Sequence, residues 1–308
     1  MKSKSVKSVN QYKSVIIVCV SLFWPVCNAA AQLQDVKFNR VSGSNGVVLG
    51  KITCITSDRY GAMWFTDQTN RCVTRFDGTI MTRYQYDRKN LNTQGGKYPE
   101  CIVADSAGFL WIGYYGLGLD RFDPATNIYT HFGHSDNDPE SLSSDTISAI
   151  LIDHLGKFWV GTDQGLNLLD EKSGKFTRYR HNPTDSLSLS HNKVRSLYED
   201  KEGTLWVGTG IAWDRDNKGG LNRLNRERNN FTRYLHDPDN PNSLLDNKVR
   251  AILEDSHGNF WIGTRGNGIH KFDKKTGLIR RIPFNSDGAK GLIRPATISP
   301  QYSGEWYL

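Results

Sequence analysis

The chain has few cysteines and no long apolar run, and both shortages limit its class. Five of its 308 residues are Cys, and neither paired C-x-x-C motifs nor an H-x-x-x-H motif accompanies them. A disulfide framework and a zinc site are therefore not predicted. The longest apolar run, Val15–Cys27, is shorter than the ~20 residues that a membrane-spanning helix needs. We predict no membrane span in this chain, no metal and no cofactor.

The first residues are typical of an export signal. Small residues follow the apolar run at Asn28–Ala31, and four lysines precede it: Lys2, Lys4, Lys7 and Lys13. This pattern predicts a signal peptide over residues 1–31 and a periplasmic or secreted mature protein; the alternative is a buried N-terminal helix. Without the four lysines, 35 Lys and Arg face 32 Asp and Glu. A net charge of +3 gives no argument for nucleic-acid binding.

A repeat fills the rest of the chain. Five tryptophans recur at spacings of 47, 48, 47 and 55 residues: Trp64, Trp111, Trp159, Trp206 and Trp261. A glycine stands three residues before each: Gly61, Gly108, Gly156, Gly203 and Gly258. An Asp stands three residues before each glycine. Five copies with fixed offsets indicate one structural unit repeated along the chain.

Within each copy, short apolar segments alternate with tight turns and predict four antiparallel strands. Such a unit every 47 residues is typical of a β-propeller blade. We expect the tryptophan to be a wedge between neighbouring blades, the alternative being an exposed row that stacks on sugars. The Asp is expected to bind the backbone of its turn through its carboxylate.

The predicted fold class is all-β, a propeller of four-stranded antiparallel blades over residues 32–308. Residues 36–51 resemble an isolated fourth strand and are expected to complete a blade. The ring is expected to be incomplete, with about five complete blades and a partial one. The expected repeats after residues 36–51 are 52–90, 99–136, 147–185, 194–240, 249–285 and a partial copy at 293–308.

The repeated pattern I-x-x-I-x-x-D-x-x-G-x-x-W-x-G-T, followed by G-L-x-x-L and F-x-x-Y, resembles the two-component regulator propeller repeat. The linkers 181–194 and 236–249 also match that family. The resemblance covers about residues 36–308. It implies the N-terminal part of a periplasmic sensor of a bacterial hybrid histidine kinase, which detects glycans. Kinase activity would reside in C-terminal domains that this chain lacks, so the chain itself is expected not to be an enzyme. The remaining sensor-kinase domains or a second copy of the chain are the expected partners.

The loops that join the second and third strands are the predicted ligand-binding sites. They return to the same face as the interblade linkers, opposite the Asp-x-x-Gly turns, and carry aromatic and polar side chains suited to an oligosaccharide. The candidate residues are Asp67, Gln68, Tyr114, Tyr115, Asp163, Gln164, Trp213, Arg215, Arg265 and Asn267. The alternative is that these are ordinary solvated loops.

Two other functions stay open. The segment Gly61–Gln68 is similar to repeats of streptogramin-lyase-like propellers, which are metal-dependent enzymes. That chemistry needs a histidine base near a carboxylate, and the linker histidines show no such pair. No catalytic residue is therefore predicted. The third possibility is a protein-binding propeller without a signalling role.

Two local features give further expectations. Cys54 and Cys101 lie ten residues before their tryptophans, where later copies have Ala149, Ser196 and Ala251. We expect a tightly packed inner position with both thiols free. In the fourth copy, eight extra residues between Thr209 and Gly220 are expected to extend one loop on the ligand face.

Overall fold

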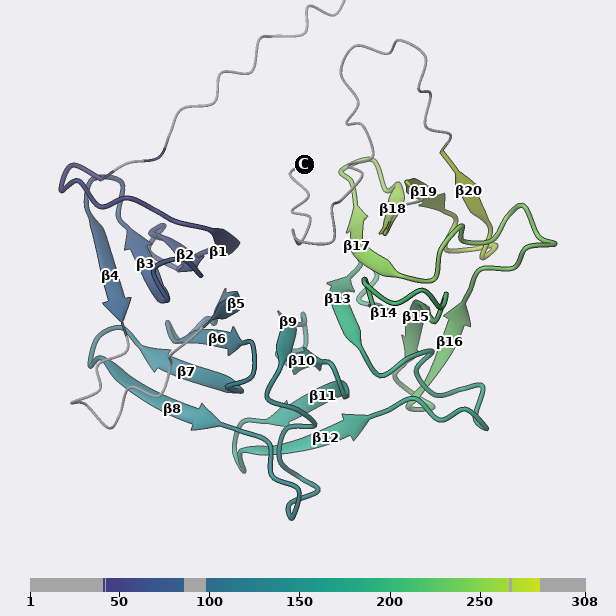
Figure 1. The fold of residues 1–308 in the computed structure, drawn as a ribbon, viewed down its shortest axis with the longest axis horizontal. Helices are drawn as coiled ribbons and strands as arrows, with labels where there is room; N and C mark the ends of the chain where they lie inside the picture. Colours follow the sequence, from purple (N-terminus) through teal and green to yellow (C-terminus); the bar gives the residue numbers. More distant parts are fainter. Residues whose placement is uncertain (1–40, 42, 86–97, 266–267, 283–308) are drawn as a thin grey trace, which may run out of the picture. The chain divides into compact units, whose positions relative to one another are not determined.

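The computed structural model describes residues 41, 43–85, 98–265 and 268–282. These residues form five four-stranded antiparallel sheets, each made of four strands that are consecutive in the chain, and contain no helix. The sheets are called blades 1 to 5 in chain order (Figure 1). The predicted all-β fold of four-stranded blades is confirmed.

The strands of each blade are short and separated by tight turns. Blade 1 contains β1 (Ile52–Ser57), β2 (Met63–Asp67), β3 (Cys72–Phe76) and β4 (Met81–Gln85). Blade 2 contains β5 (Pro99–Ala104), β6 (Leu110–Tyr114), β7 (Leu119–Asp123) and β8 (Ile128–Phe132). Blade 3 contains β9 (Ile147–Ile152), β10 (Phe158–Thr162), β11 (Gly165–Asp170) and β12 (Lys175–Tyr179).

The last two blades follow the same order. Blade 4 contains β13 (Val194–Glu199), β14 (Leu205–Gly210), β15 (Gly219–Asn225) and β16 (Asn230–Tyr234). Blade 5 contains β17 (Val249–Glu254), β18 (Phe260–Thr264), β19 (Ile269–Phe272) and β20 (Ile279–Arg281). The first strands β1, β5, β9, β13 and β17 contact one another in chain order and are the inner strands.

The hydrophobic core consists of four layers, each shared by two neighbouring blades. The layer between blades 2 and 3, for example, joins Trp111 and Leu119 to Ile147 and Phe158. Similar layers join blades 1 and 2, 3 and 4, and 4 and 5. Because one sheet cannot bury both of its faces alone, each blade depends on its neighbours for burial.

Four of the five repeated tryptophans, Trp64, Trp111, Trp159 and Trp206, are confirmed as interblade wedges, and Trp261 lies in the last described blade. The Trp111 ring lies 4.3 Å from the Phe158 ring of the next blade, and the Trp206 ring lies 4.9 Å from that of Phe260. Each indole N–H donates to the Asp six residues earlier, at 2.8–3.0 Å. The other carboxylate oxygen of each Asp accepts a turn backbone N–H, as expected. One carboxylate thus fixes both the turn and the wedge.

The glycine two residues after Trp159 makes room for the next inner strand. A Cβ on Gly161 would lie 2.5 Å from Val194 Cγ1. Gly113 faces Ile147 and Gly208 faces Val249 in the same way. The small inner residues predicted from the sequence pair with these glycines, as in Cys101↔Gly113 and Ala149↔Gly161. Cys54 and Cys101 are both free, as predicted.

The interblade linkers are held by repeated polar contacts. In three linkers a histidine Nδ1–H donates to a leucine carbonyl at 2.6 Å: His134 to Leu142, His181 to Leu189 and His236 to Leu244. After each of these three linkers, an arginine of the next blade's fourth strand donates to the linker, as Arg178 does to Ser141 and Leu142. These histidines therefore shape loops.

Several expectations lie outside the described residues. They concern the signal peptide, residues 36–40 and 42 of the strand expected at 36–51, and the partial copy at 293–308. The described residues of that expected strand, 41 and 43–51, precede β1 and form no strand. Ring closure is not shown by the described blades, which is consistent with the expected incomplete ring. The repeat boundaries given above stay predictions. No helix in the described part of the chain is long and apolar enough to cross a membrane.

Candidate functional site: the inner-strand face

A backbone hydrogen bond places every loop between second and third strands beside an inner strand. In each blade, a residue at or just after the end of the second strand donates its N–H to a backbone carbonyl. The acceptor is seventeen residues earlier in the chain, and the distance is 2.9–3.3 Å. The five pairs are Gln68 to Lys51, Tyr115 to Tyr98, Asp163 to Thr146, Gly210 to Lys193 and Arg265 to Lys248. These loops therefore lie at the starts of the inner strands, on the face opposite the Asp-x-x-Gly turns.

Each inner strand begins with an irregularity in its pairing. In blade 4, Val194 pairs with Thr209 and Ser196 with Gly208, so Arg195 has no cross-strand partner. Glu100, Ser148 and Arg250 occupy the same place, and the blade 1 irregularity includes Thr53. We call these five residues the bulge positions. Bulges re-aim side chains and are common beside functional sites.

Three of the five bulge positions, Glu100, Arg195 and Arg250, carry charges that act on one another although their blades are not all neighbours. Burial raises the pKa of Glu100 in blade 2, and Arg195 and Arg250 of blades 4 and 5 oppose that rise. Burial lowers the pKa of Arg250 to about 10, helped by repulsion from Arg195 and Arg265. Burial likewise lowers the pKa of Arg195. Desolvated charged groups that act on one another are typical of binding sites.

A pocket of about 300 Å³ lies on this face between the loops of blades 3 and 4. Its lining residues are Asp163, Gln164, His191, Asn192, Lys193 and Ile211. Burial lowers the pKa of His191, which favours its neutral ring. Because His191 Nδ1 accepts the N–H of Lys193 at 2.9 Å, Nε2 carries the proton. His191 thus offers a hydrogen-bond donor to an occupant.

In blades 1 and 2, the candidate residues take different places. The buried carboxylate of Asp67 accepts hydrogen bonds from Gly50 and Asn70, which holds the loop together. Tyr114 is buried in the core. Gln68 donates to Glu100 at 2.8 Å, and Tyr115 is 60% exposed. Gln68 and Tyr115 are thus the ones available at this face.

In blades 3 to 5, the candidates lie toward solvent. Asp163 accepts the Ser144 hydroxyl and lines the pocket with the exposed Gln164. Arg215 is exposed, and Arg265 is half-buried. Asn267 lies outside the described residues.

The inserted loop of blade 4 is anchored on blade 5. Asn217 Oδ1 accepts the N–H of Asn247, and Lys248 Nζ donates to the Asp214 carbonyl at 2.7 Å. Trp213 is 57% exposed, and its ring lies 5.9 Å from the Arg265 guanidinium carbon. The loop thus presents an indole at this face while the blade keeps all four strands.

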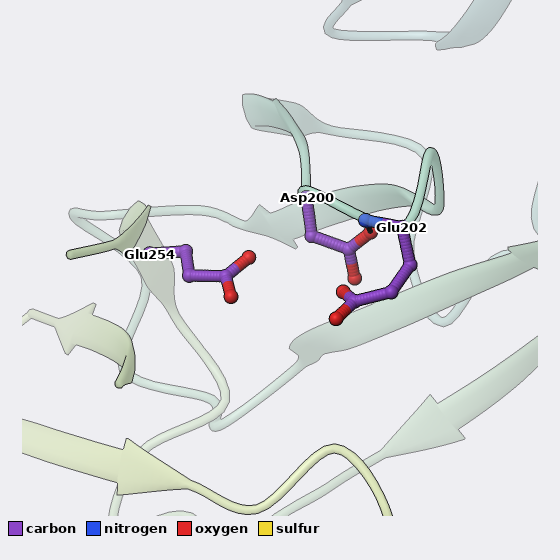
Figure 2. Close-up of side chains that lie close together, drawn as sticks. All are labelled: Asp200, Glu202 and Glu254. Carbon is purple, nitrogen blue, oxygen red and sulfur yellow. Dashed lines mark hydrogen bonds between the residues drawn. The ribbon is translucent and has the colours of Figure 1, made fainter. Parts of the chain in front are cut away.

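A group of three carboxylates lies near the opposite-face turns of blades 4 and 5. Figure 2 shows Asp200, Glu202 and Glu254, whose ligand atoms lie within 4.8 Å of one another. Lys274 Nζ donates to all three, at 3.3 Å from Asp200 and 3.1 Å from Glu254. Arg226 links Asp153 and Glu199 in the same way one blade earlier. The group therefore fits an interblade ion pair and does not fit a metal site.

The bulge positions and His191 were missed in the sequence. The five bulge positions hold a threonine, a glutamate, a serine and two arginines. Because the residue type changes from copy to copy, comparison of the repeats shows no constant residue there. The usable signal was their register: they occur at the same offset from each tryptophan, eleven residues before it. A position that varies inside an otherwise constant repeat is a candidate for specificity.

The fold defines the class of the protein: it is a β-propeller built from repeated four-stranded blades. Residues 98–277, more than half of the chain, match the family model described as SMP-30/gluconolactonase/LRE-like region. The chain belongs to this family. No curated protein matches the sequence.

Three solved structures illustrate the likeness. The extracellular domain assigned to a hybrid two component system of B. thetaiotaomicron is 25% identical with a TM-score of 0.64, covering 78% of this chain and 31% of that one. This confirms the resemblance to two-component sensor propellers, and the chain spans about a third of that relative. Virginiamycin B lyase from Staphylococcus aureus is 15% identical with a TM-score of 0.54, and the match covers 77% of this chain and 71% of the lyase. PorZ from Porphyromonas gingivalis is 16% identical with a TM-score of 0.53, and the match covers 74% of this chain and 33% of PorZ. The last two show the fold alone.

Proposed function

We propose that the chain is an exported, saccharide-binding propeller, the N-terminal part of the sensor of a hybrid two-component system. The observation that carries this proposal is its likeness to the B. thetaiotaomicron extracellular domain over 78% of its own length. Signalling would then pass through domains beyond the propeller or through a second copy of the chain.

The binding face proposed for the saccharide is the one formed by the second-to-third-strand loops and the bulge positions. Trp213 and Tyr115 supply exposed rings that can stack on sugar faces. Gln68, Glu100 and the donor Nε2–H of His191 supply directional polar groups. The mixture of aromatic and polar groups is what saccharide recognition requires.

Binding is favoured over catalysis because of how the histidines are used. His134, His181 and His236 donate to linker carbonyls, and His191 presents a protonated nitrogen to the pocket. The linker histidines thus serve the structure of the loops, and His191 presents a donor rather than a free base to the pocket. Incubating the protein with an oligosaccharide mixture, followed by mass spectrometry, should leave the mixture unchanged. Steady formation of a shortened or unsaturated product would instead support an enzyme.

Replacing Trp213 by Ala tests the proposed face. Because the indole is mostly exposed, Trp213→Ala should weaken oligosaccharide binding at least ~10-fold in calorimetric titrations and leave the melting temperature nearly unchanged. Tyr60→Ala is the matched control, since Tyr60 is 76% exposed within an Asp-x-x-Gly turn of the opposite face. Unaltered binding with a melting temperature several degrees lower would assign Trp213 to packing.

A further inference from the structure

The bulge position has a structural requirement that a hydroxyl group satisfies. In blade 1, Thr53 Oγ1 donates to the Pro99 carbonyl of the next inner strand at 3.0 Å. In blade 3, Ser148 Oγ donates to the Val194 carbonyl at 2.6 Å. Both bonds close the seam between neighbouring inner strands. Long cationic side chains at this position in blades 4 and 5 therefore exceed what the fold needs.

Arg195 and Arg250 have unused hydrogen-bond donors. Within the described residues, Nε of Arg195 and Nη1 of Arg250 are buried and have no hydrogen-bond partner. Neither guanidinium forms an ion pair with a carboxylate in that part of the chain. A buried unpaired donor costs about 1–3 kcal/mol, so two at equivalent positions need an explanation.

The charges around the pair leave it electropositive. Lys193 and Arg265 lie close enough to act on the two arginines, and Arg195 repels Arg250 directly. The carboxylates of Glu100 and Asp163 oppose this repulsion. Each already accepts a hydrogen bond, Glu100 from Gln68 and Asp163 from Ser144. Guanidinium groups form paired hydrogen bonds with carboxylate and with sulfate or phosphate oxygens.

We propose that Arg195 and Arg250 form an oxyanion-binding site that takes the carboxylate or sulfate group of an acidic saccharide. The anion would accept the unused N–H groups and neutralise the repulsion between the two guanidinium groups. The saccharide part of this inference rests on the proposed function, whereas the oxyanion site stands on the arginines alone.

The test uses calorimetric titration of the full chain at low, constant chloride with three probes: sodium sulfate, glucuronate and glucose. Sulfate or glucuronate should bind, and glucose should bind at least ~10-fold more weakly than the better anion. Arg195→Ser and Arg250→Ser introduce the hydroxyl group found at this position in blades 1 and 3 and should each weaken anion binding about 10-fold or more. Arg280→Gln, on the exposed edge strand β20, should leave it unchanged.

A melting experiment separates this role from a structural one. Because each serine variant removes a desolvated, repelled charge, its melting temperature without anion should equal or exceed that of the parent chain. The anion should raise the melting temperature of the parent and of Arg280→Gln but not of the serine variants. Tighter binding of sulfate would indicate that the site takes a sulfate group of the saccharide, and tighter binding of glucuronate would indicate a carboxylate group.

Two results would overturn the site: no binding of either anion by the parent chain, or equal affinity in the serine variants. Anion binding that depends on both arginines, together with failure of neutral oligosaccharides to bind, would keep the oxyanion site and reject the broader saccharide proposal. Saccharide binding that depends on Trp213 but not on the arginines would keep the broader saccharide proposal and reject the oxyanion site.

Discussion

At the scale of single residues, His131 gives the fold a pH dependence. Its Nδ1 lies 2.8 Å from a carboxylate oxygen of the fully buried Asp120. This hydrogen bond raises the pKa of His131 above its ordinary value of 6.5. The folded chain therefore holds this proton more tightly than the unfolded chain does.

We expect the free energy of unfolding to fall as pH rises through the raised pKa of His131. The stabilisation is complete below pH 6.5 and is lost above the folded-state pKa, because the neutral ring no longer forms an ion pair. His131→Gln should flatten this part of a urea-unfolding profile measured against pH. His257→Gln, at an exposed turn, is the control. An unchanged slope in His131→Gln would assign the dependence to another group.

At the scale of the element, two glycines of blade 3 serve different needs. Gly156 has a φ of +71° with no atom within 4 Å of an added Cβ, whereas Gly161 faces Val194 at 2.5 Å. The first is required by the turn and the second by the neighbouring inner strand. The repeat motif alone does not distinguish them.

Substituting both glycines separates these causes. Gly156→Ala should cost about 1 kcal/mol from backbone strain, and Gly161→Ala about 1–3 kcal/mol from overpacking. Val194→Ala removes the clashing methyl groups, so it should recover part of the loss in the Gly161→Ala background and none in Gly156→Ala. Urea unfolding of the singles and doubles measures this coupling. Equal coupling in both backgrounds would contradict the packing explanation.

The sequence predicted the strands well because each copy repeats the same turn and strand signals. The wedge tryptophans and the Asp turns follow from constant residues at constant offsets. The indole–carboxylate bond of Trp159 and Asp153 was missed because spacing alone does not show side-chain direction. Asp67 and Tyr114 were predicted to lie in loops, but they are the last residues of β2 and β6 and are buried, because the repeat pattern shows neither where a strand ends nor that both side chains turn inward. The bulge at Arg195 depends on register, which only pairing shows.

At the scale of the whole molecule, shared core layers imply cooperative unfolding. Opening one blade exposes a layer that also belongs to its neighbour, so blades 1 and 2 are expected to unfold with the rest. All three thiols of the described chain lie in these two blades: Cys54, Cys72 and Cys101. Labelling of the thiols therefore measures the unfolding of blades 1 and 2, whereas tryptophan fluorescence measures the unfolding of all five blades.

We expect the thiols to be unreactive in the native protein, because they are mostly buried and burial raises the pKa of each. Labelling at increasing urea should follow the same midpoint as tryptophan fluorescence. As a control, labelling in full denaturant should reach three thiols in the chain lacking residues 1–31. Reaction at clearly lower urea would show that blades 1 and 2 open on their own.

The bulge positions also affect how such a chain can evolve. A side chain without a cross-strand partner can be exchanged without shifting strand register or filling a core layer. Thr53 and Arg250 already differ in size and charge on equivalent inner strands. Gene copies can therefore diversify at the positions of Glu100, Arg195 and Arg250, where no hydroxyl closes the seam, while the tryptophans, glycines and linker histidines stay constant. Under the proposed function, ligand preference and foldability are inherited through separate sets of residues, so new specificities can arise one substitution at a time.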